Sequence, residues 1–428
     1  MTGHWQTRGP SLIKPRASVT SSAPPTVRPA RIGRAAPPFG IKPLKVLMQA
    51  DAHDPRESEG VLNPAAIRSA EGDLYLFPRL VAKGNCSRIG IAKVHFDRAG
   101  EPVGAVRLGV VLEPTEPYEK NAFTGGGCED PRITYVEALG CYLMAYTAFS
   151  PLGPRLALAA SKDLFQWERL GLVHFSPSSR FDLNHADNKD GAVFPSLVAD
   201  PRTGEPSVAL IHRPTFRESP LDLVAHHLQS KLSTAAEGYG AGAQAPPLAL
   251  SQATRRKGRP SIWMSYCHPQ ALLGGTLRFH SHHRLLSGRY WWERAKVGAG
   301  APPILTQHGW LLIYHGVAGH DVAGGHLRYS GGAVVLDPLR PKHVLYRSAQ
   351  PVLVPWPHEL DTERRRHVVF PSGLDRRTDI GQPDRVDVYY GMSDKCIGVG
   401  SLTLPHVLPI QSASAGHVMR DVAREVAW

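Results

Sequence analysis

The apolar and polar positions of this chain alternate over short distances. From about residue 45 onward, short runs of apolar and aromatic residues are separated by Gly, Pro, Asp and Asn, with little sustained helical periodicity. Runs of this length between turn residues are typical of β-strands. We expect strands at residues 74–80, 88–94, 142–148, 156–160, 207–212, 262–267, 310–315 and 386–390. The pattern therefore predicts an all-β fold.

Several of the expected strands look like copies of one unit. In residues 142–146, 262–266, 311–314 and 386–390, an apolar run ends in tyrosine, and a turn and another strand follow. A β-unit that recurs at intervals of tens of residues indicates a propeller. A generic β-sandwich remains the alternative on this pattern alone.

Three segments depart from the β pattern. Residues 1–42 are basic and rich in Pro, Ser and Ala, so we expect a disordered tail. Residues 216–260 are polar and rich in Ala, Gly and Pro, which predicts an insertion with a short helix at 221–232. We expect a C-terminal helix at residues 413–428. The folded domain is then expected at residues 43–412.

The positive charge of the chain is concentrated at its start. Of the net charge of +12, residues 1–45 supply eight through Lys and Arg without any acid, which leaves +4 for the other 383 residues. The body is therefore nearly balanced, and we expect no nucleic-acid partner. An Arg-rich, acid-free leader is also compatible with an organellar transit peptide or with a start codon placed too early.

Apolar content and cysteine spacing argue against three classes of protein: membrane proteins, disulfide-bonded proteins and zinc proteins. The hydrophobic share of 42% supports a substantial core, and no run approaches the roughly 18 to 20 apolar residues of a membrane helix. We expect a cytoplasmic protein that has no membrane partner. The five cysteines are scattered without Cys-x-x-Cys or Cys/His zinc spacing, so we expect reduced thiols and no metal site.

The run Gly125-Gly-Gly-Cys-Glu-Asp-Pro-Arg132 is the strongest candidate for an active site. Its glycines allow a flexible loop to approach a ligand closely. Pro131 is expected to hold Asp130 in extended geometry. Neighbours on an extended backbone point to opposite faces, so Glu129 and Asp130 should not form a close pair, and Arg132 should lie on the side of Asp130. One acid would then work beside one cation.

Motifs in order along the chain resemble glycoside hydrolase family 130, the mannoside phosphorylases and related β-mannosidases. The resemblance spans about residues 45–405. It rests on Gly127-Cys-Glu-Asp-Pro-Arg132, Ser161-Lys-Asp-Leu-Phe-Gln-Trp167, Asn188-Lys-Asp190, Phe194-Pro195, His212-Arg-Pro214, Pro302-Pro303, Gly309-Trp310, Tyr314-His-Gly-Val317 and Tyr389-Tyr-Gly-Met-Ser-Asp394. It implies a five-bladed β-propeller with the active site at one end of the central channel.

By this resemblance, Asp130 matches the general acid that protonates the departing glycosidic oxygen. The family can also pass this proton through a sugar hydroxyl. The resemblance therefore implies that the Asp130 carboxyl group supplies the proton, either directly or from a position too far from the glycosidic oxygen for direct transfer.

The resemblance also implies a phosphate site. Lys189, Arg213 and His315 match positions that meet phosphate in the family, and Arg88 is a plausible fourth member. Phosphate is itself an anionic nucleophile, so it replaces the second carboxylate that an inverting hydrolase needs. The joint presence of these groups favours phosphorolysis over hydrolysis.

Sugar-binding positions carry over as well. Asn63 and Asp394 match residues that hold hydroxyls of the mannosyl unit, Arg79 is expected nearby, and Asp190 is expected to align sugar or phosphate. Pro64 stands where some members have serine, which leaves the preferred linkage open.

The resulting hypothesis is an inverting phosphorylase that converts a β-1,2- or β-1,4-linked mannoside and phosphate into α-mannose 1-phosphate. Inorganic phosphate is a co-substrate, and no cofactor is expected. The alternatives are a β-mannosidase that uses water and a non-catalytic glycan-binding propeller. A homo-oligomer is possible.

Overall fold

Strands make up most of the structure. The computed structural model describes residues 38–121, 125–178, 181–216, 259–275, 277–319, 327–355 and 367–409, all within the unit Pro37–Trp428. Helical segments of these residues are short: α3 (Pro269–Leu273) and the 3-10 turns η1 (Glu137–Leu139), η2 (Trp291–Glu293) and η3 (Arg377–Ile380). None of the helices described is long and apolar enough to cross a membrane. The all-β prediction is confirmed.

An eight-stranded sheet contains the first half of the described chain. Its strands are β2 (Gly60–Arg68), β3 (Leu74–Ala82), β4 (Cys86–Phe96), β5 (Pro102–Leu112), β6 (Gly126–Val136), β7 (Cys141–Ser150), β8 (Gly153–Ser161) and β9 (Glu168–Leu172). Strands β4 and β6 meet only in a short parallel contact, Cys86 with Gly126 and Ser87 with Gly127. The sheet is thus two antiparallel four-stranded units, β2–β5 and β6–β9, joined at one corner.

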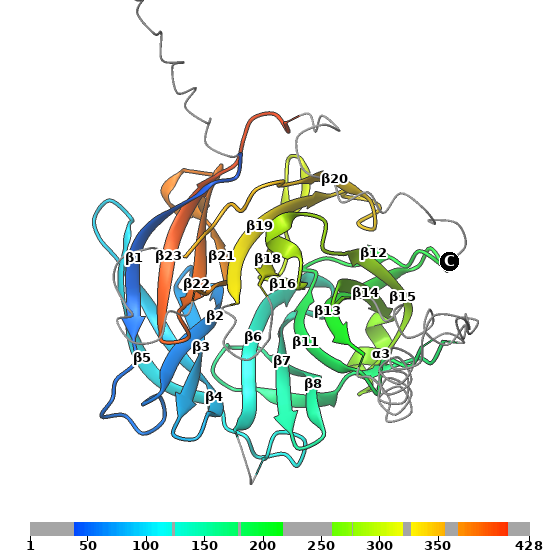
Figure 1. The fold of residues 1–428 in the computed structure, drawn as a ribbon, viewed down its shortest axis with the longest axis horizontal. Helices are drawn as coiled ribbons and strands as arrows, with labels where there is room; N and C mark the ends of the chain where they lie inside the picture. Colours follow the sequence, from blue (N-terminus) through cyan, green and yellow to red (C-terminus); the bar gives the residue numbers. More distant parts are fainter. Residues whose placement is uncertain are drawn as a thin grey trace, which may run out of the picture. The chain divides into compact units, whose positions relative to one another are not determined.

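Three further sheets follow in chain order (Figure 1). The six-stranded sheet contains β10 (His174–Phe175), β11 (Asp187–Val193), β12 (Val198–Ala199), β13 (Pro206–Thr215), β14 (Ile262–Cys267) and β15 (Arg278–Leu286). The five-stranded sheet contains β16 (Lys296–Ala299), β17 (Ile304–Thr306), β18 (Gly309–Ala318), β19 (Arg328–Leu336) and β20 (Val344–Arg347). The last sheet contains β21 (Val369–Arg376), β22 (Arg385–Met392), β23 (Cys396–Thr403) and β1 (Ile41–Gln49).

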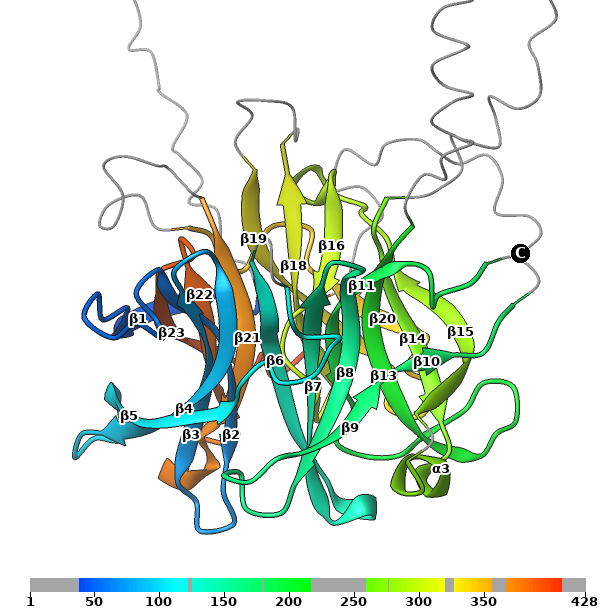
Figure 2. The same ribbon diagram turned by 90° about the horizontal axis from the view of Figure 1, so that it is seen from below.

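The hydrophobic core is divided among the spaces between successive sheets and half-sheets. Phe77 of β3 packs with Met144 of β7, for example, while Leu311 of β18 packs with Val388 of β22. The inner strands β2, β6, β11, β16 and β21 lie around a common centre, as Figures 1 and 2 show. Because successive side chains of a strand alternate in direction, each sheet contributes to the core on both of its faces.

The eight strands expected from the sequence all lie within observed strands. The expected glycine loop is wrong, because Gly126 and Gly127 begin β6 instead. A Cβ on Gly127 would lie 2.1 Å from the Ser87 carbonyl oxygen, so glycine is needed for β6 to pack against β4. Strand β1 begins at Ile41, inside the segment 1–42 that was expected to be a tail. Residues 1–37, the expected helices at 221–232 and 413–428 and nearly all of the insertion lie outside the described residues.

A buried arginine connects sheets at the centre. The Arg132 side chain donates from Nε to the Gly300 carbonyl (2.6 Å), which follows β16, and from Nη1 to the Asp130 carbonyl (2.9 Å). Its guanidinium carbon lies 5.2 Å from the ring centroid of Phe370 on β21. Arg132 is 1% exposed. One side chain of β6 therefore holds segments of two other sheets.

We predict that Arg132→Lys lowers the free energy of unfolding by about 2–4 kcal/mol, because lysine keeps the charge but cannot bond these carbonyls in the same planar arrangement. Urea denaturation measures the change. Arg340→Lys, at an exposed turn position, is the matched control and should leave stability nearly unchanged. Equal stability of both variants would contradict the connecting role of Arg132.

Candidate active site

A pocket of about 1060 Å³ lies at the centre, where the inner strands meet. All the site residues expected from the sequence line it except Arg88 and His315: Asn63, Arg79, Asp130, Lys189, Asp190, Arg213 and Asp394. The structure thus brings together residues more than 300 positions apart in the chain.

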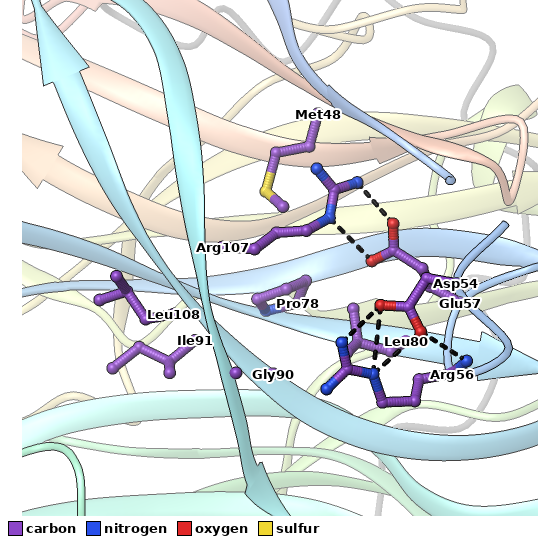
Figure 3. Close-up of a pocket in the computed structure, with 11 residues that line it drawn as sticks. Met48, Asp54, Arg56, Glu57, Pro78, Leu80, Gly90, Ile91, Arg107 and Leu108 are labelled. Carbon is purple, nitrogen blue, oxygen red and sulfur yellow. Dashed lines mark hydrogen bonds and ion pairs between the residues drawn. The ribbon is translucent and has the colours of Figure 1, made fainter. Parts of the chain in front are cut away.

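A smaller pocket of about 290 Å³ lies elsewhere, between β3, β4, β5 and the segment after β1 (Figure 3). Its walls combine apolar and charged side chains, and the charged groups neutralise one another in pairs. Arg107 bonds Glu57, and Arg56 bonds Asp54. None of the expected site residues lines it. We therefore locate the candidate active site in the central pocket.

Backbone irregularities turn the acidic and amide side chains into the pocket. The strands β2, β6 and β11 each contain a bulge at which the pairing register shifts. The bulge of β2 is at Asn63, that of β6 at Asp130 and that of β11 at Asp190. These three residues have φ of 47°, 49° and 57°, and Asp394, in the turn after β22, has 56°. A bulge redirects a side chain, and non-glycine residues with positive φ cluster at functional sites. The expected extended geometry of Asp130 is therefore wrong, because the bulge overrides the local effect of Pro131.

The Asp130 carboxylate is buried but well supported. Its Oδ1 accepts from Asn63 Nδ2 (2.9 Å) and from Arg79 Nη1 (3.4 Å). Burial raises the pKa of Asp130, but the positive charges of Arg79, Arg132 and Lys189 outweigh burial and hold that pKa below its usual value. In the ligand-free protein this carboxyl group is ionised at neutral pH.

Glu129 lies closer to Asp130 than the alternation of an extended strand predicts. Arg79 bridges the two acids, since its Nη2 donates to Glu129 Oε1 at 2.9 Å. Lys189 Nζ donates to the other oxygen of Glu129 at 3.1 Å. Glu129 and Asp130 are thus linked through Arg79, because the bulge places both side chains within reach of this arginine. Arg132, expected beside the Asp130 carboxylate, bonds its backbone carbonyl instead.

Asp190 forms a second buried acidic centre. Arg213 Nε donates to its Oδ2 at 2.5 Å, and His315 Nε2 lies 3.6 Å from the same oxygen. Burial opposes ionisation, yet Arg213 and His315 hold the pKa of Asp190 well below its usual value. Burial lowers the pKa of His315 to about 3, although Asp190 acts in the opposite direction. The imidazole is therefore neutral, and it packs on Phe370 behind the pocket wall with 4.5 Å between ring centroids.

Several positively charged side chains line the pocket. Lys189 and Arg213 were expected there, and Lys296 and Lys395 join them. Lys296 lies on β16, with its Nζ 5.2 Å from the ring centroid of Tyr329. No sequence signal distinguishes Lys296; the structure shows that it lies two residues before Gly298, where strands approach closely. Lys395 directly follows the expected Asp394.

Arg88 lies away from this group. Ser87 points toward the pocket side of β4, where its Oγ accepts from Arg79 Nε at 2.9 Å. The alternation of the strand turns Arg88 to the other face, where it bonds Glu113 (2.9 Å) and the Arg56 carbonyl (3.1 Å). We refer to the pocket cations Lys189, Arg213, Lys296 and Lys395 as the anion-binding group, and Arg88 is not part of it.

The remaining nucleophile and metal candidates have structural surroundings. Burial, with Glu119 nearby, raises the pKa of the Cys128 thiol well above its usual value, so it stays protonated. His282 Nδ1 lies 2.8 Å from Ser265 Oγ within a buried hydrogen-bond chain. Across the described residues, no three His, Cys, Asp or Glu side chains form a group that could hold a metal ion.

Comparison with known proteins matches this chain to mannoside phosphorylases. The profile of a family described as β-1,4-mannooligosaccharide phosphorylase matches residues 37–205 and 253–412. The chain is 27% identical over 372 residues to the 1,2-β-oligomannan phosphorylase of Thermoanaerobacter sp. (strain X514), covering 85% of this chain and 96% of that protein. Over 133 residues it is 34% identical to the β-1,4-mannooligosaccharide phosphorylase of Ruminococcus albus, covering 31% of this chain and 38% of that protein.

Solved structures share the fold. A β-1,2-mannobiose phosphorylase from Listeria innocua, in complex with β-1,2-mannobiose, superposes with a TM-score of 0.57 at 21% identity, covering 85% of this chain and 94% of that one. A glycosyl hydrolase from Bacteroides ovatus superposes with a TM-score of 0.58 at 19% sequence identity. The superposition covers 86% of this chain and 94% of that one.

We predict that Gly298→Ala impairs anion binding in the pocket. A Cβ at this position would lie 2.1 Å from Asp190 Oδ2 and 2.5 Å from His315 Nε2, so it would push Asp190 away from Arg213. Inorganic phosphate should raise the melting temperature of the unmodified protein more than that of the variant. Gly104→Ala, whose Cβ would meet no atom within 4 Å, is the control. An equal phosphate effect in all three proteins would contradict this geometry.

Proposed function

We propose, starting from the fact that this chain belongs to glycoside hydrolase family 130, that it is an inverting phosphorylase of β-mannosides. Its substrates would be β-1,2- or β-1,4-linked manno-oligosaccharides and inorganic phosphate. Its products would be α-mannose 1-phosphate and a shortened acceptor. Relatives with both linkages in their names support the substrate class and leave the linkage open.

One observation carries the choice of phosphate over water. An inverting hydrolase needs a second carboxylate that is free to activate water. The two further buried acids at this site are paired with cations: Asp190, which lines the pocket, with Arg213, and Glu129, which lies behind the pocket wall, with Arg79 and Lys189. Cationic groups remain along the wall, and they suit an anionic nucleophile that needs no base.

The proposed reaction uses the pocket residues in distinct ways. Protonated Asp130 gives its proton to the glycosidic oxygen, directly or through a sugar hydroxyl, as the bond from that oxygen to C1 breaks. A phosphate oxygen held by Lys189, Arg213 and Lys296 bonds to C1 from the opposite face, which inverts the configuration. Asn63 and Asp394 would bind mannosyl hydroxyls. No cofactor takes part in this scheme.

We also propose that the sheets form a five-bladed propeller. The units β2–β5 and β6–β9 would be two blades, and the three remaining sheets would be the others. The division of the core among the spaces between these units supports this arrangement. The pairing of β1 with β23 would close the ring.

The test is incubation of the protein with a panel of β-1,2- and β-1,4-linked manno-oligosaccharides, with and without inorganic phosphate. We expect mannose 1-phosphate only when phosphate is present, because the buried acids Glu129 and Asp190 are held in ion pairs with cations. Chromatography with a phosphate-specific stain separates this product from free mannose. Release of free mannose at the same rate without phosphate would identify a β-mannosidase instead.

We predict that Asp130→Asn loses at least about 100-fold in turnover while the protein stays folded, because the amide keeps the shape but supplies no acidic proton. An aryl mannoside with a good leaving group should restore part of the rate, since it needs little protonation. Asp187→Asn is the control, because Asp187 lines the same pocket but pairs with Arg155. Unaltered turnover of Asp130→Asn would exclude the acid role.

A further inference from the structure

Glu129 is a buried acid to which neither the reaction scheme nor the pocket lining assigns a role. Its side chain is 2% exposed, and the pocket surface does not include it. Its two oxygens are bound by two different cations, Arg79 on β3 and Lys189 on β11. Both of these cations line the pocket. Glu129 thus lies behind the pocket wall, between Arg79, which contacts Asp130, and Lys189 of the anion-binding group.

The contacts form a continuous chain across the site. Lys189 bonds Glu129 at 3.1 Å, Glu129 bonds Arg79 at 2.9 Å, and Arg79 bonds Asp130 at 3.4 Å. The contact between Arg79 and Asp130 is the longest of the three. Arg79 is otherwise held by neutral groups, the Ser87 hydroxyl at 2.9 Å and the Asn85 side-chain carbonyl at 3.3 Å. Glu129 and Asp130 are the carboxylates that it contacts among the described residues, and Asp394 attracts it from farther away.

We propose that Glu129 is a positioning residue that connects the anion-binding group to Asp130, so that the arrival of phosphate promotes the protonation of Asp130. This inference rests on the proposed phosphorylase function and adds an order of events to it. The acid becomes ready to donate its proton when the nucleophile is in place.

The argument follows from competition for Lys189. This lysine is 29% exposed and reaches both the pocket and Glu129, so a bound phosphate dianion competes with Glu129 for its charge. As Lys189 turns to phosphate, Glu129 keeps only Arg79, and the attraction between them strengthens. Arg79 then withdraws from the weaker 3.4 Å contact with Asp130. The carboxylate form of Asp130 loses support at that moment.

The charges around Asp130 in the ligand-free protein are mostly positive, and they lower its pKa. Positive groups on β3, β6, β11 and β13 favour its ionised form: Arg79, Arg132, Lys189 and Arg213. Three other acids draw on the same cations, Glu129 on its own strand, Asp190 on β11 and Asp394 after β22. Phosphate adds negative charge to this set and neutralises members of it, which raises the pKa of Asp130. The low pKa of Asp130 in the ligand-free protein is thereby reconciled with its role as an acid.

The test is Glu129→Gln, which removes the charge and keeps the shape. Without Glu129, Arg79 and Lys189 remain with Asp130, so its pKa in the complex falls. A general acid works only when protonated, so the alkaline limb of the pH profile of kcat should move to lower pH by about one unit or more. Lys189 is also freed for phosphate, and the phosphate KM should fall by about three- to tenfold. A merely structural defect would not lower this KM.

Two variants complete the design. Glu129→Asp keeps the charge, so it should return the alkaline limb most of the way toward that of the unmodified enzyme. Glu119→Gln removes another buried acid, one paired with Arg169 outside the pocket, and should leave the pH profile unchanged. An alkaline limb that stays in place in Glu129→Gln, or a phosphate KM that rises, would overturn the proposal.

A spectroscopic measurement keeps the proposal testable if Glu129→Gln does not fold. Difference infrared spectroscopy of the unmodified protein should show the carbonyl band of a protonated carboxyl group when saturating inorganic phosphate is added at neutral pH. The band should be absent in Asp130→Asn. Its absence in the unmodified protein would overturn the link. Failure to form mannose 1-phosphate from any mannoside would instead overturn the proposed function itself.

Discussion

The centre of this protein is organised by the requirement that each buried charge has a partner of opposite sign. Isolated ions are expensive to bury, and the structure accordingly gives Asp130, Glu129 and Asp190 an arginine or lysine each. These cations come from β3, β11 and β13, so the pairing also sets how the inner strands approach one another. The same pairs affect the chemistry, because a carboxylate whose pKa is lowered by a paired cation is a weaker base toward water.

The site also depends on irregular backbone, which turns polar side chains into the pocket. Regular strands would turn half of their side chains away from the centre, and the bulges of β2, β6 and β11 place a polar side chain of each strand in the pocket. Asn63, Asp130 and Asp190 have positive φ as a result, which costs on the order of 1–3 kcal/mol each. The surrounding hydrogen bonds and ion pairs offset this strain.

Sequence patterns predict the parts of this structure that depend on local order. Each of the eight strands predicted from short apolar runs exists, and the expected site residues other than Arg88 and His315 line one pocket. What the sequence does not show depends on contacts between distant strands. The bulge at Asp130 arises in the pairing of β6 with β7, and the bridge from Arg79 to Glu129 requires the junction of β4 and β6. Lys296 was missed because a single lysine before a glycine pair has no distinctive pattern.

The pairing of β1 with β23 has a consequence for synthesis of the protein. Ile41 leaves the ribosome early, but its partner Leu402 emerges only after the rest of the sheets, roughly 20 to 70 seconds later at about 5–20 residues per second. Until then β1 is an unpaired edge whose apolar side chains are exposed to other chains. Contacts so distant in sequence also slow folding, because a long loop must close before they form. The last sheet, which supplies Phe370 and the turn with Asp394, is therefore completed last, and the protein gains its full substrate pocket only after β23 has been synthesised.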